Sequence, residues 1–301
     1  MEEKQETKKK KVSYSQYSMY SKCPYSWKLN YLEGKRIYEA SLNMCFGTAI
    51  HHALQEYIKI LYTVGQVQAD SLDVHQMFKD KFKEETDKAV TKDNLKYTED
   101  DYTGFVYDSD DILNAFLSTS NRIKHFPSNK YEFIGVELPL ELDIKNNVGF
   151  VAYVDLVLKE KETGKIKIFD FKTSTLGWNK WQQQDSSKVD QVLLYKAFYS
   201  KKFNVPLSNI DVEFYILKRK LYENVSFPQS RIQIFNPTAT QPAVISTLNE
   251  FSAFVGSCFT TEGEYNVNGK FPKIPGKAKK NCKYCSHKGV NCDAKADILE
   301  D

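Results

Sequence analysis

The sequence predicts an α/β fold in which a central mixed β-sheet is flanked by helices. Three observations support this prediction: the first 130 residues carry helical periodicity, residues 131–173 carry three consecutive strand patterns, and a helical pattern then leads into a further strand. This order of elements is typical of an α/β domain, with an α+β arrangement as the alternative that the pattern alone leaves open.

Helices are expected first along the chain, at residues 13–33, 44–62, 70–92 and 109–125. The second of these is the clearest, because its apolar residues recur every three or four positions, at Ile50, Leu54, Ile58 and Leu61. The polar stretch at 93–108 is expected to be a loop. Together, residues 65–130 are interpreted as a helical insertion, and the lysine-rich residues 1–12 as a disordered basic tail.

Strands follow in the middle of the chain. Segments 131–143, 149–159 and 165–173 are rich in Val, Ile, Phe and Tyr, with turns expected at the Asn-Asn and Glu-Thr-Gly sequences between them. The remaining elements are expected as a helix at 185–203, strands at 211–218 and 231–235, and a helix at 243–258.

The composition excludes several classes of protein. A hydrophobic content of 41% and an aromatic content of 14% are too high for a disordered chain, and a formal net charge of +3 excludes a polycation. No apolar run is long enough to span a membrane, and the charged N-terminus is unlike an export signal, so we expect a cytoplasmic protein in a reducing compartment. The sequence contains no P-loop motif.

The segment KIKIFDFKTS, residues 165–174, carries the most informative polar residues. Because alternate residues of a strand share a face, Asp170 and Lys172 point to one side while Phe169 and Phe171 point to the other, into a core. A carboxylate and an ammonium group are costly to place on a buried strand, which favours a functional role. The alternative is an exposed edge strand that carries a surface ion pair.

A second carboxylate lies in the preceding strand pattern, at Asp155. A tight hairpin joins the two strands, so Asp155 and Asp170 can converge on one face. Two converging carboxylates are suited to a divalent cation such as Mg²⁺ or Mn²⁺, because these ions prefer oxygen ligands. Lys172 beside them could orient a water molecule or stabilise developing negative charge.

These residues resemble the signature of the PD-(D/E)XK nuclease superfamily, and their surroundings resemble its RecB-like branch. Asp155 followed by Asp170-x-Lys172 matches the signature itself. The other matching elements, in the family's order, are the Gly47-x-x-x-His51 motif on a helix, Glu137 on the strand before Asp155, and the Gln191-x-x-x-Tyr195 motif on the helix after Lys172. The family often has glycine where this chain has Ala152, and a methyl group is a mild change.

The resemblance implies a restriction-endonuclease-like core over residues 13–262 and a role for each matching residue. His51, Asp155 and Asp170 would bind the metal ion together with the main-chain carbonyl of Phe171. Lys172 would be the catalytic lysine, and Glu137 would belong to the catalytic set. Gln191 and Tyr195 would position the DNA strand and the attacking water. His52, next to His51, is a rival candidate for the histidine ligand.

The cysteines form a second pattern, Cys282-x₂-Cys285-x₆-Cys292, near the C-terminus. A CxxC turn lets two thiolates bind one metal, and the third cysteine adds another ligand. The fourth ligand could be His287, which would make a zinc knuckle, or the distant Cys23. Free thiols are a further alternative, and Cys45 and Cys258 are interpreted as core thiols.

The segment around Cys23-Pro24 resembles the opening of the iron–sulfur subgroup of the same superfamily, which includes the AddB nuclease domain and CRISPR-associated adaptation nucleases. This resemblance implies a [4Fe–4S] cluster held by Cys23, Cys282, Cys285 and Cys292. Residues 263–301 would then be a cysteine-rich iron–sulfur segment that closes onto Cys23.

The function expected from these patterns is a metal-dependent deoxyribonuclease, an exonuclease on single-stranded DNA, that acts in recombination, repair or replication. Seven lysines between Tyr265 and Cys292 could contact phosphates, and Trp178 or Trp181 could stack on bases. A helicase or recombination protein is the expected partner class. The alternatives are a non-catalytic DNA-binding subunit that kept the fold, and an RNA nuclease.

Overall fold

The computed structural model describes residues 9–293, which divide between two compact units. Unit 1 comprises Met1–Tyr38, Pro139–Ala152 and Pro242–Asp301, and unit 2 comprises Glu39–Leu138 and Tyr153–Gln241. The N-terminal helices therefore belong to the same unit as the C-terminal segment, and the boundary at residue 262 stays a prediction.

Unit 2 is built on a mixed β-sheet, as predicted. Its strands are β4 (Ile166–Ser174), β5 (Ile210–Lys218), β6 (Ile232–Phe235) and the part of β3 (Gly149–Glu160) from Tyr153 onward, since the first residues of β3 belong to unit 1. Strand β4 pairs antiparallel with β3 and parallel with β5, and β5 pairs antiparallel with β6. The turn between β3 and β4 contains Gly164 with φ of 70°, a conformation that glycine adopts without strain.

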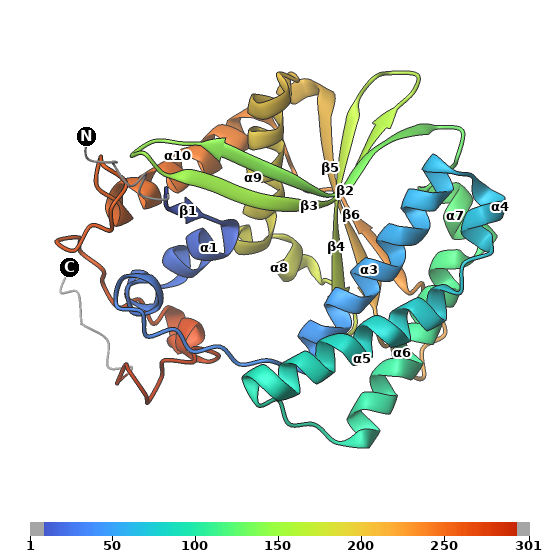
Figure 1. Cartoon of the computed structure of the whole chain (residues 1–301), viewed down its shortest axis with the longest axis horizontal. Helices are drawn as coiled ribbons and strands as arrows, with labels where there is room; N and C mark the ends of the chain where they lie inside the picture. Colours follow the sequence, from blue (N-terminus) through green and yellow to red (C-terminus); the bar gives the residue numbers. More distant parts are fainter. Residues whose placement is uncertain (1–8, 294–301) are drawn as a thin grey trace, which may run out of the picture. The chain divides into compact units, whose positions relative to one another are not determined.

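Helices cover both faces of this sheet (Figure 1). Helix α3 (Leu42–Thr63) packs on one face, and α9 (Ser186–Phe203) contacts β4 and β5 from the other. Helix α9 forms the crossover that the parallel pair of β4 and β5 requires. Two short helical turns, α8 (Lys180–Gln183) and η2 (Leu207–Asn209), lie on either side of α9 in the sequence.

The helical insertion contains α4 (Gln66–Asp70), α5 (Val74–Asp93), α6 (Glu99–Leu117) and α7 (Thr119–His125). Figure 1 shows α5 and α6 beside α3, and the core between them is largely aromatic. After α7, strand β2 (Tyr131–Asp143) leads to β3 and pairs with it.

The expected loop at 93–108 is wrong, because α6 already begins at Glu99. Thr98 and Asp101 form a capping box, in which each side chain accepts the other's backbone N–H. Three consecutive acidic residues, Glu99, Asp100 and Asp101, occupy the first turn, where the helix dipole favours negative charge. These polar residues thus begin the helix, although they lack the apolar periodicity by which the other helices were predicted.

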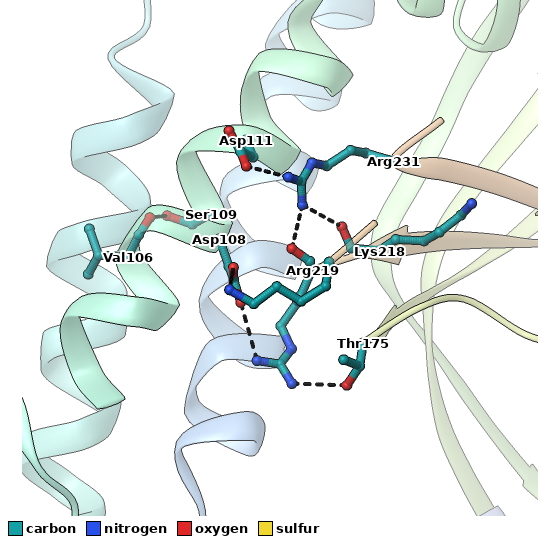
Figure 2. A network of polar contacts seen from close by, with 9 residues as sticks. Val106, Asp108, Ser109, Asp111, Thr175, Lys218, Arg219 and Arg231 are labelled. Atoms are coloured by element: carbon teal, nitrogen blue, oxygen red, sulfur yellow. Dashed lines mark hydrogen bonds and ion pairs between the residues drawn. The ribbon is translucent and has the colours of Figure 1, made fainter. Parts of the chain in front are cut away.

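A polar network ties α6 to the strand ends of unit 2 (Figure 2). The side chain of Asp108 is nearly buried, and it pairs with Arg219 at 3.3 Å and with Lys220 at 2.7 Å. Arg219 also donates to the Thr175 hydroxyl at 3.1 Å, just beyond the end of β4. The residues that follow β4 and β5 are therefore fixed to the insertion.

A second arginine extends this network. The guanidinium of Arg231 pairs with Asp111 and donates to the backbone carbonyls of Lys218 and Arg219 (Figure 2). It therefore bridges α6 to the carboxyl end of β5, immediately before β6.

In unit 1, the predicted helix at 13–33 is three shorter elements. These are α1 (Tyr14–Lys22), α2 (Pro24–Trp27) and the π-helical turn η1 (Lys28–Leu32). Cys23 separates the first two, with extended backbone angles of φ −160° and ψ 103°. The cause is Pro24, since a residue before proline is driven away from helical angles.

The N-terminal stretch is also more ordered than predicted. Lys11–Val12 forms β1, which pairs parallel with Gly149–Phe150, and Val12 is fully buried. Acidic partners neutralise the basic side chains: Lys9 pairs with Asp143 at 2.7 Å and Lys11 with Glu141 at 2.6 Å. The tail was predicted to be disordered over residues 1–12, and residues 1–8 lie outside the described residues.

Aromatic packing joins the two ends of the chain within unit 1. The fully buried Trp27 contacts Tyr20 and Tyr31 near the N-terminus, and also the rings of Phe254, Phe259, Tyr265 and Phe271. Helix α10 (Gln241–Cys258) contributes the first of these later rings, and η3 (Lys277–Cys282) follows them. Among the described residues, no helix combines the length and the apolar character needed to cross a membrane.

Candidate active site

Two paired strands of unit 2 carry the two predicted aspartates. The register of β3 and β4 pairs Leu156 with Phe169, so the next position places Asp155 opposite Asp170. Asp170 is 1% exposed to solvent, and the side chain of Asp155 is 14% exposed. The structure therefore brings the two carboxylates together on one face, as the strand pattern predicts.

Asp155 is held in its charged form by its neighbours. The backbone N–H of Phe171 donates to its Oδ2 at 2.7 Å, and Nδ1 of His51 lies 3.6 Å from its Oδ1. Burial opposes the carboxylate, but the positive charges of His51 and Lys172 outweigh it and lower the pKa of Asp155.

Of the two adjacent histidines on α3, His51 is the one that faces the carboxylates. Its ring also meets that of Phe171 edge-on, with centroids 5.8 Å apart. Burial disfavours the imidazolium form, but the charge of Asp155 and the contact with it raise the pKa of His51. His51 is therefore positioned as an electrostatic partner of Asp155.

Asp170 and Lys172 form a close pair. Nζ of Lys172 lies 2.6 Å from Oδ2 of Asp170, and the Lys172 side chain is 30% exposed to solvent. Burial and the nearby Asp155 raise the pKa of Asp170 to about 6, although Lys172 opposes this shift. Phe169 and Phe171 point into the core on the other face. The alternative of an exposed edge strand is wrong, because β4 is paired on both sides.

A series of hydrogen bonds runs from Lys172 to α9. Lys172 donates to Oε1 of Gln191 at 3.0 Å, and Nε2 of Gln191 donates to the Tyr195 hydroxyl at 2.7 Å. Burial strongly raises the pKa of Tyr195, so its hydroxyl stays protonated. Gln191 and Tyr195 lie one helical turn apart on α9, on the side that faces β4. Tyr195 thus fixes the Gln191 amide, which in turn orients the Lys172 ammonium.

Sequence reasoning missed Gln55, which links Glu137 to the site. Gln55 is 5% exposed and donates to Oε1 of Glu137 at 2.7 Å and to the Asp155 carbonyl at 3.1 Å. Glu137 itself has φ of 46°, an uncommon conformation for a residue other than glycine. The available signal was spacing, since Gln55 lies four residues after His51 on the same face of α3.

Gly47, one turn before His51, is not required to be glycine by its packing. An added Cβ would meet only the Thr173 hydroxyl, at an ordinary contact distance of 3.7 Å. No close approach by the described chain therefore explains this glycine.

The donor set fits a divalent cation that prefers oxygen ligands. Oδ2 of Asp170 is buried and accepts no hydrogen bond of acceptable geometry, even though Lys172 lies close to it. Such an oxygen retains a lone pair for a cation, and Asp155 adds a second carboxylate. Over residues 9–293, however, no three His, Cys, Asp or Glu side chains come together as a metal-binding group. A ligand set would have to include a backbone carbonyl, water or the substrate.

Four cysteines line one cavity in unit 1. This cavity has a volume of about 200 Å³, and its lining includes Cys23, Cys282, Cys285 and Cys292. Burial and the neighbouring thiols raise the pKa of Cys282. The backbone N–H of Ile274 also donates to Sγ of Cys23 at 3.4 Å. Cys45 and Cys258 are buried elsewhere, as expected for core thiols.

His287 lines the same cavity, but its ring nitrogens are already engaged. Nε2 lies 2.7 Å from the Asn30 amide, and Nδ1 lies 3.3 Å from the Asn291 amide. Burial lowers the pKa of His287, so the imidazole is neutral. A zinc knuckle that uses His287 would have to break one of these contacts.

The two tryptophans proposed for base stacking differ in exposure. Trp178 is 6% exposed; it packs on Phe214 and lies under the ammonium of Lys188 at 4.6 Å. Trp181, on α8, is 82% exposed. Only Trp181 has a ring face that a base could reach.

Comparisons with known proteins give one family. A family model described as "PD-(D/E)XK nuclease superfamily" matches residues 11–292. Among curated proteins, no match was found. Among solved structures, the chain resembles a protein from Eubacterium rectale described as a "putative exonuclease", with 12% sequence identity, a TM-score of 0.47, and coverage of 82% of this chain and 79% of that one. We draw no conclusion from a structural likeness this distant.

Proposed function

The chain belongs to the PD-(D/E)XK nuclease superfamily, and from this premise we propose that it is a metal-dependent nuclease that cuts single-stranded DNA. One observation supports the proposal most directly: an unbroken series of polar contacts joins Asp170, Lys172, Gln191 and Tyr195 beside Asp155. A purely structural ion pair would not need Gln191 to orient the lysine. The arrangement suits hydrolysis of a phosphodiester bond.

The proposed roles follow from the contacts. When bound, Mg²⁺ or Mn²⁺ would supply Lewis-acid activation of the phosphate and of the attacking water. Asp155 and Asp170 would hold the ion, with His51 and the carbonyl of Phe171 as the further predicted ligands. Lys172 would stabilise the negative charge that develops on the phosphate, because its pKa is raised and it stays protonated.

The residues of α9 would act through Lys172. Gln191 holds the ammonium in one direction, and Tyr195 holds the amide of Gln191. Gln55 would do the same for Glu137, which it ties to the backbone of β3. Positioning of this kind matters because a small displacement of a catalytic group lowers the rate sharply.

We also propose that Cys23, Cys282, Cys285 and Cys292 hold a [4Fe–4S] cluster. The shared cavity, the apolar residues around it and the N–H donor to Sγ of Cys23 support this assignment. Thiolates are the usual ligands of such clusters, and hydrogen bonds to the sulfurs tune them. The cluster would join α1 to the C-terminal segment within unit 1.

Contacts to the DNA strand would come from exposed groups. Trp181 could stack on a base, and the lysines between Tyr265 and Cys292 could neutralise phosphates. We place the activity in DNA recombination, repair or replication, with a helicase or recombination protein as the partner class.

A cleavage assay tests this proposal. The purified full chain is incubated with Mg²⁺ or Mn²⁺ on end-labelled linear single strands, on circular single strands and on RNA of the same sequence. We expect cleavage of linear DNA that stops when EDTA is added. Binding without cleavage under either metal would instead indicate the non-catalytic subunit, and cleavage of RNA alone would indicate an RNA nuclease.

Replacement of His51 by alanine should raise the Mn²⁺ concentration needed for cleavage by about 10-fold or more, because the site loses a nitrogen donor next to Asp155. The measurement is a metal titration of the cleavage rate, with a thermal melt to show that the fold is intact. His52→Ala, which changes the neighbouring residue, is the control and should match the wild type. An unchanged metal requirement in His51→Ala would show that His51 is not a ligand and that carboxylates are the only side chains that bind the ion.

A further inference from the structure

A cavity lies at the carboxyl ends of β4 and β5, beyond the candidate catalytic residues of unit 2. Its volume is about 490 Å³, and its lining includes Ser174, Gly177, Gln182, Lys218, Tyr222 and Gln233. None of these residues belongs to the set proposed above to bind metal or carry out hydrolysis. Ser174 is two residues after Lys172 on β4, so the cavity begins where the candidate site ends.

Lys218 enters this cavity from the same face of the sheet as Lys172. The parallel register pairs Lys172 with Ile216 and Ser174 with Lys218. Paired residues of parallel strands share a face, as do alternate residues of one strand, so Lys218 points to the side of Lys172 and Asp170. Strand geometry puts the Cα atoms of the two lysines about 8 Å apart.

The ammonium of Lys218 has no acidic partner among the described residues. The backbone carbonyl of Lys218 accepts a hydrogen bond from Arg231, and Figure 2 shows the Lys218 side chain pointing away from this polar network. Burial lowers the pKa of Lys218, so its charge is partly removed from water without compensation. An anion in the cavity would supply that compensation.

Gly177, which lines the cavity, leaves room for the aliphatic part of the Lys218 side chain. Gly177 has φ of 90°, and a Cβ there would lie 2.5 Å from Oε1 of Gln233 and 3.1 Å from Cδ of Lys218. The Gln233 side-chain amide holds the backbone of Trp178: its Oε1 accepts from the Trp178 N–H at 2.7 Å, and its Nε2 donates to the Trp178 carbonyl at 2.8 Å. Any larger residue at 177 would therefore force the Gln233 and Lys218 side chains to move.

An aromatic ring stands at the edge of the cavity. Tyr222 is 54% exposed, and the Gln229 side chain clamps its backbone through two hydrogen bonds, at 2.8 and 2.7 Å. A ring whose backbone is fixed offers a base a stacking surface at little cost in conformational entropy.

We propose that this cavity is a nucleotide-binding subsite, in which Lys218 binds the phosphate next to the one that is cut and Tyr222 stacks on the adjoining base of a DNA strand. The inference rests on the proposed function, since it defines the neighbouring phosphate by the cleaved one. It adds a substrate contact that sets where along the strand the enzyme can cut.

The first test measures binding in EDTA, so that it does not depend on cleavage. Anisotropy of a labelled single-stranded oligonucleotide gives the dependence of affinity on salt for the full chain. Lys218→Gln should reduce the slope of log affinity against log salt by about 0.7, the value for one phosphate contact on a single strand. Lys165→Gln, which removes the same charge just before β4 at the opposite end of the sheet, is the control and should leave the slope unchanged.

The second test uses a substrate in which one phosphate is replaced by a neutral methylphosphonate, moved along the strand. The wild type should cut more slowly when the neutral linkage is next to the cleaved bond, and Lys218→Gln should lose that sensitivity. Tyr222→Leu should weaken binding without changing the salt slope. An unchanged slope in Lys218→Gln, or an equal change in Lys165→Gln, would overturn the subsite while wild-type cleavage still supports the nuclease. If the wild type cuts no substrate, the proposed function fails, and the salt dependence of binding still decides whether Lys218 contacts a phosphate.

Discussion

Replacing Lys172 with alanine is expected to reduce the cleavage rate by about 100-fold or more, because a single charge-stabilising contact in a transition state commonly contributes that much. Lys172 is the charged side chain that both contacts Asp170 and is oriented by Gln191. Binding of DNA in the absence of metal should be nearly unchanged, since the loss concerns the transition state. The measurement is single-turnover cleavage of an end-labelled strand alongside anisotropy in EDTA.

The controls separate chemistry from folding. Lys159→Ala removes an exposed lysine from the far end of β3 and should cut normally. Without Lys172, the buried Asp170 would be left without its cation, and its pKa would rise further. If this destabilises Lys172→Ala, Lys172→Arg keeps a positive charge but presents it in a different geometry, and it should melt near the wild type and still cut poorly. Wild-type turnover by a folded Lys172→Ala protein would contradict the assignment.

Replacing Cys23 with serine is expected to abolish the iron–sulfur cluster, although Cys23 lies about 260 residues before the other three cysteines in the sequence. Anaerobically purified wild type should contain about four irons per chain and absorb broadly at about 400 nm. The serine variant should lose both signals. Its melting temperature should also fall, because a metal site that joins distant segments contributes its binding free energy to folding.

Two further variants sharpen this result. Cys45→Ser changes a buried thiol of unit 2 that is outside the cavity, and it should keep its iron. His287→Gln retains hydrogen-bonding groups near Asn30 but removes the imidazole, so it should also keep its iron. Stoichiometric zinc in place of iron, lost in His287→Gln, would establish a zinc knuckle instead.

Much of the sheet could be predicted from the sequence, because alternation and turns are local signals. The three strands from 131 to 174 and the helix before Phe203 lie where they are expected. On β4, the alternation of Phe169 and Phe171 with Asp170 and Lys172 also predicted which side chains reach the core.

What could not be predicted depends on neighbours that the local pattern does not contain. Strand β1 forms by pairing with the distant Gly149–Phe150 and burying Val12, and Pro24 breaks a helix that amphipathic periodicity alone would continue. Gln55 and Lys218 were missed for the same reason. Their roles follow from the packing of α3 on the sheet and from the register between β4 and β5, and a single sequence fixes neither.

The ion pairs between α6 and the strand ends join residues that are 111 and 120 positions apart, Asp108 with Arg219 and Asp111 with Arg231. If β5 detached, Asp108 would remain as a nearly buried carboxylate without its cations, a state that costs about 3–5 kcal/mol when one partner of a buried pair is removed. Opening β5 alone would therefore destabilise the position of α6, and the reverse holds as well. We expect the insertion and the strand that carries Lys218 to unfold as one cooperative block, so that proteases and exchanging solvent reach both segments together or neither.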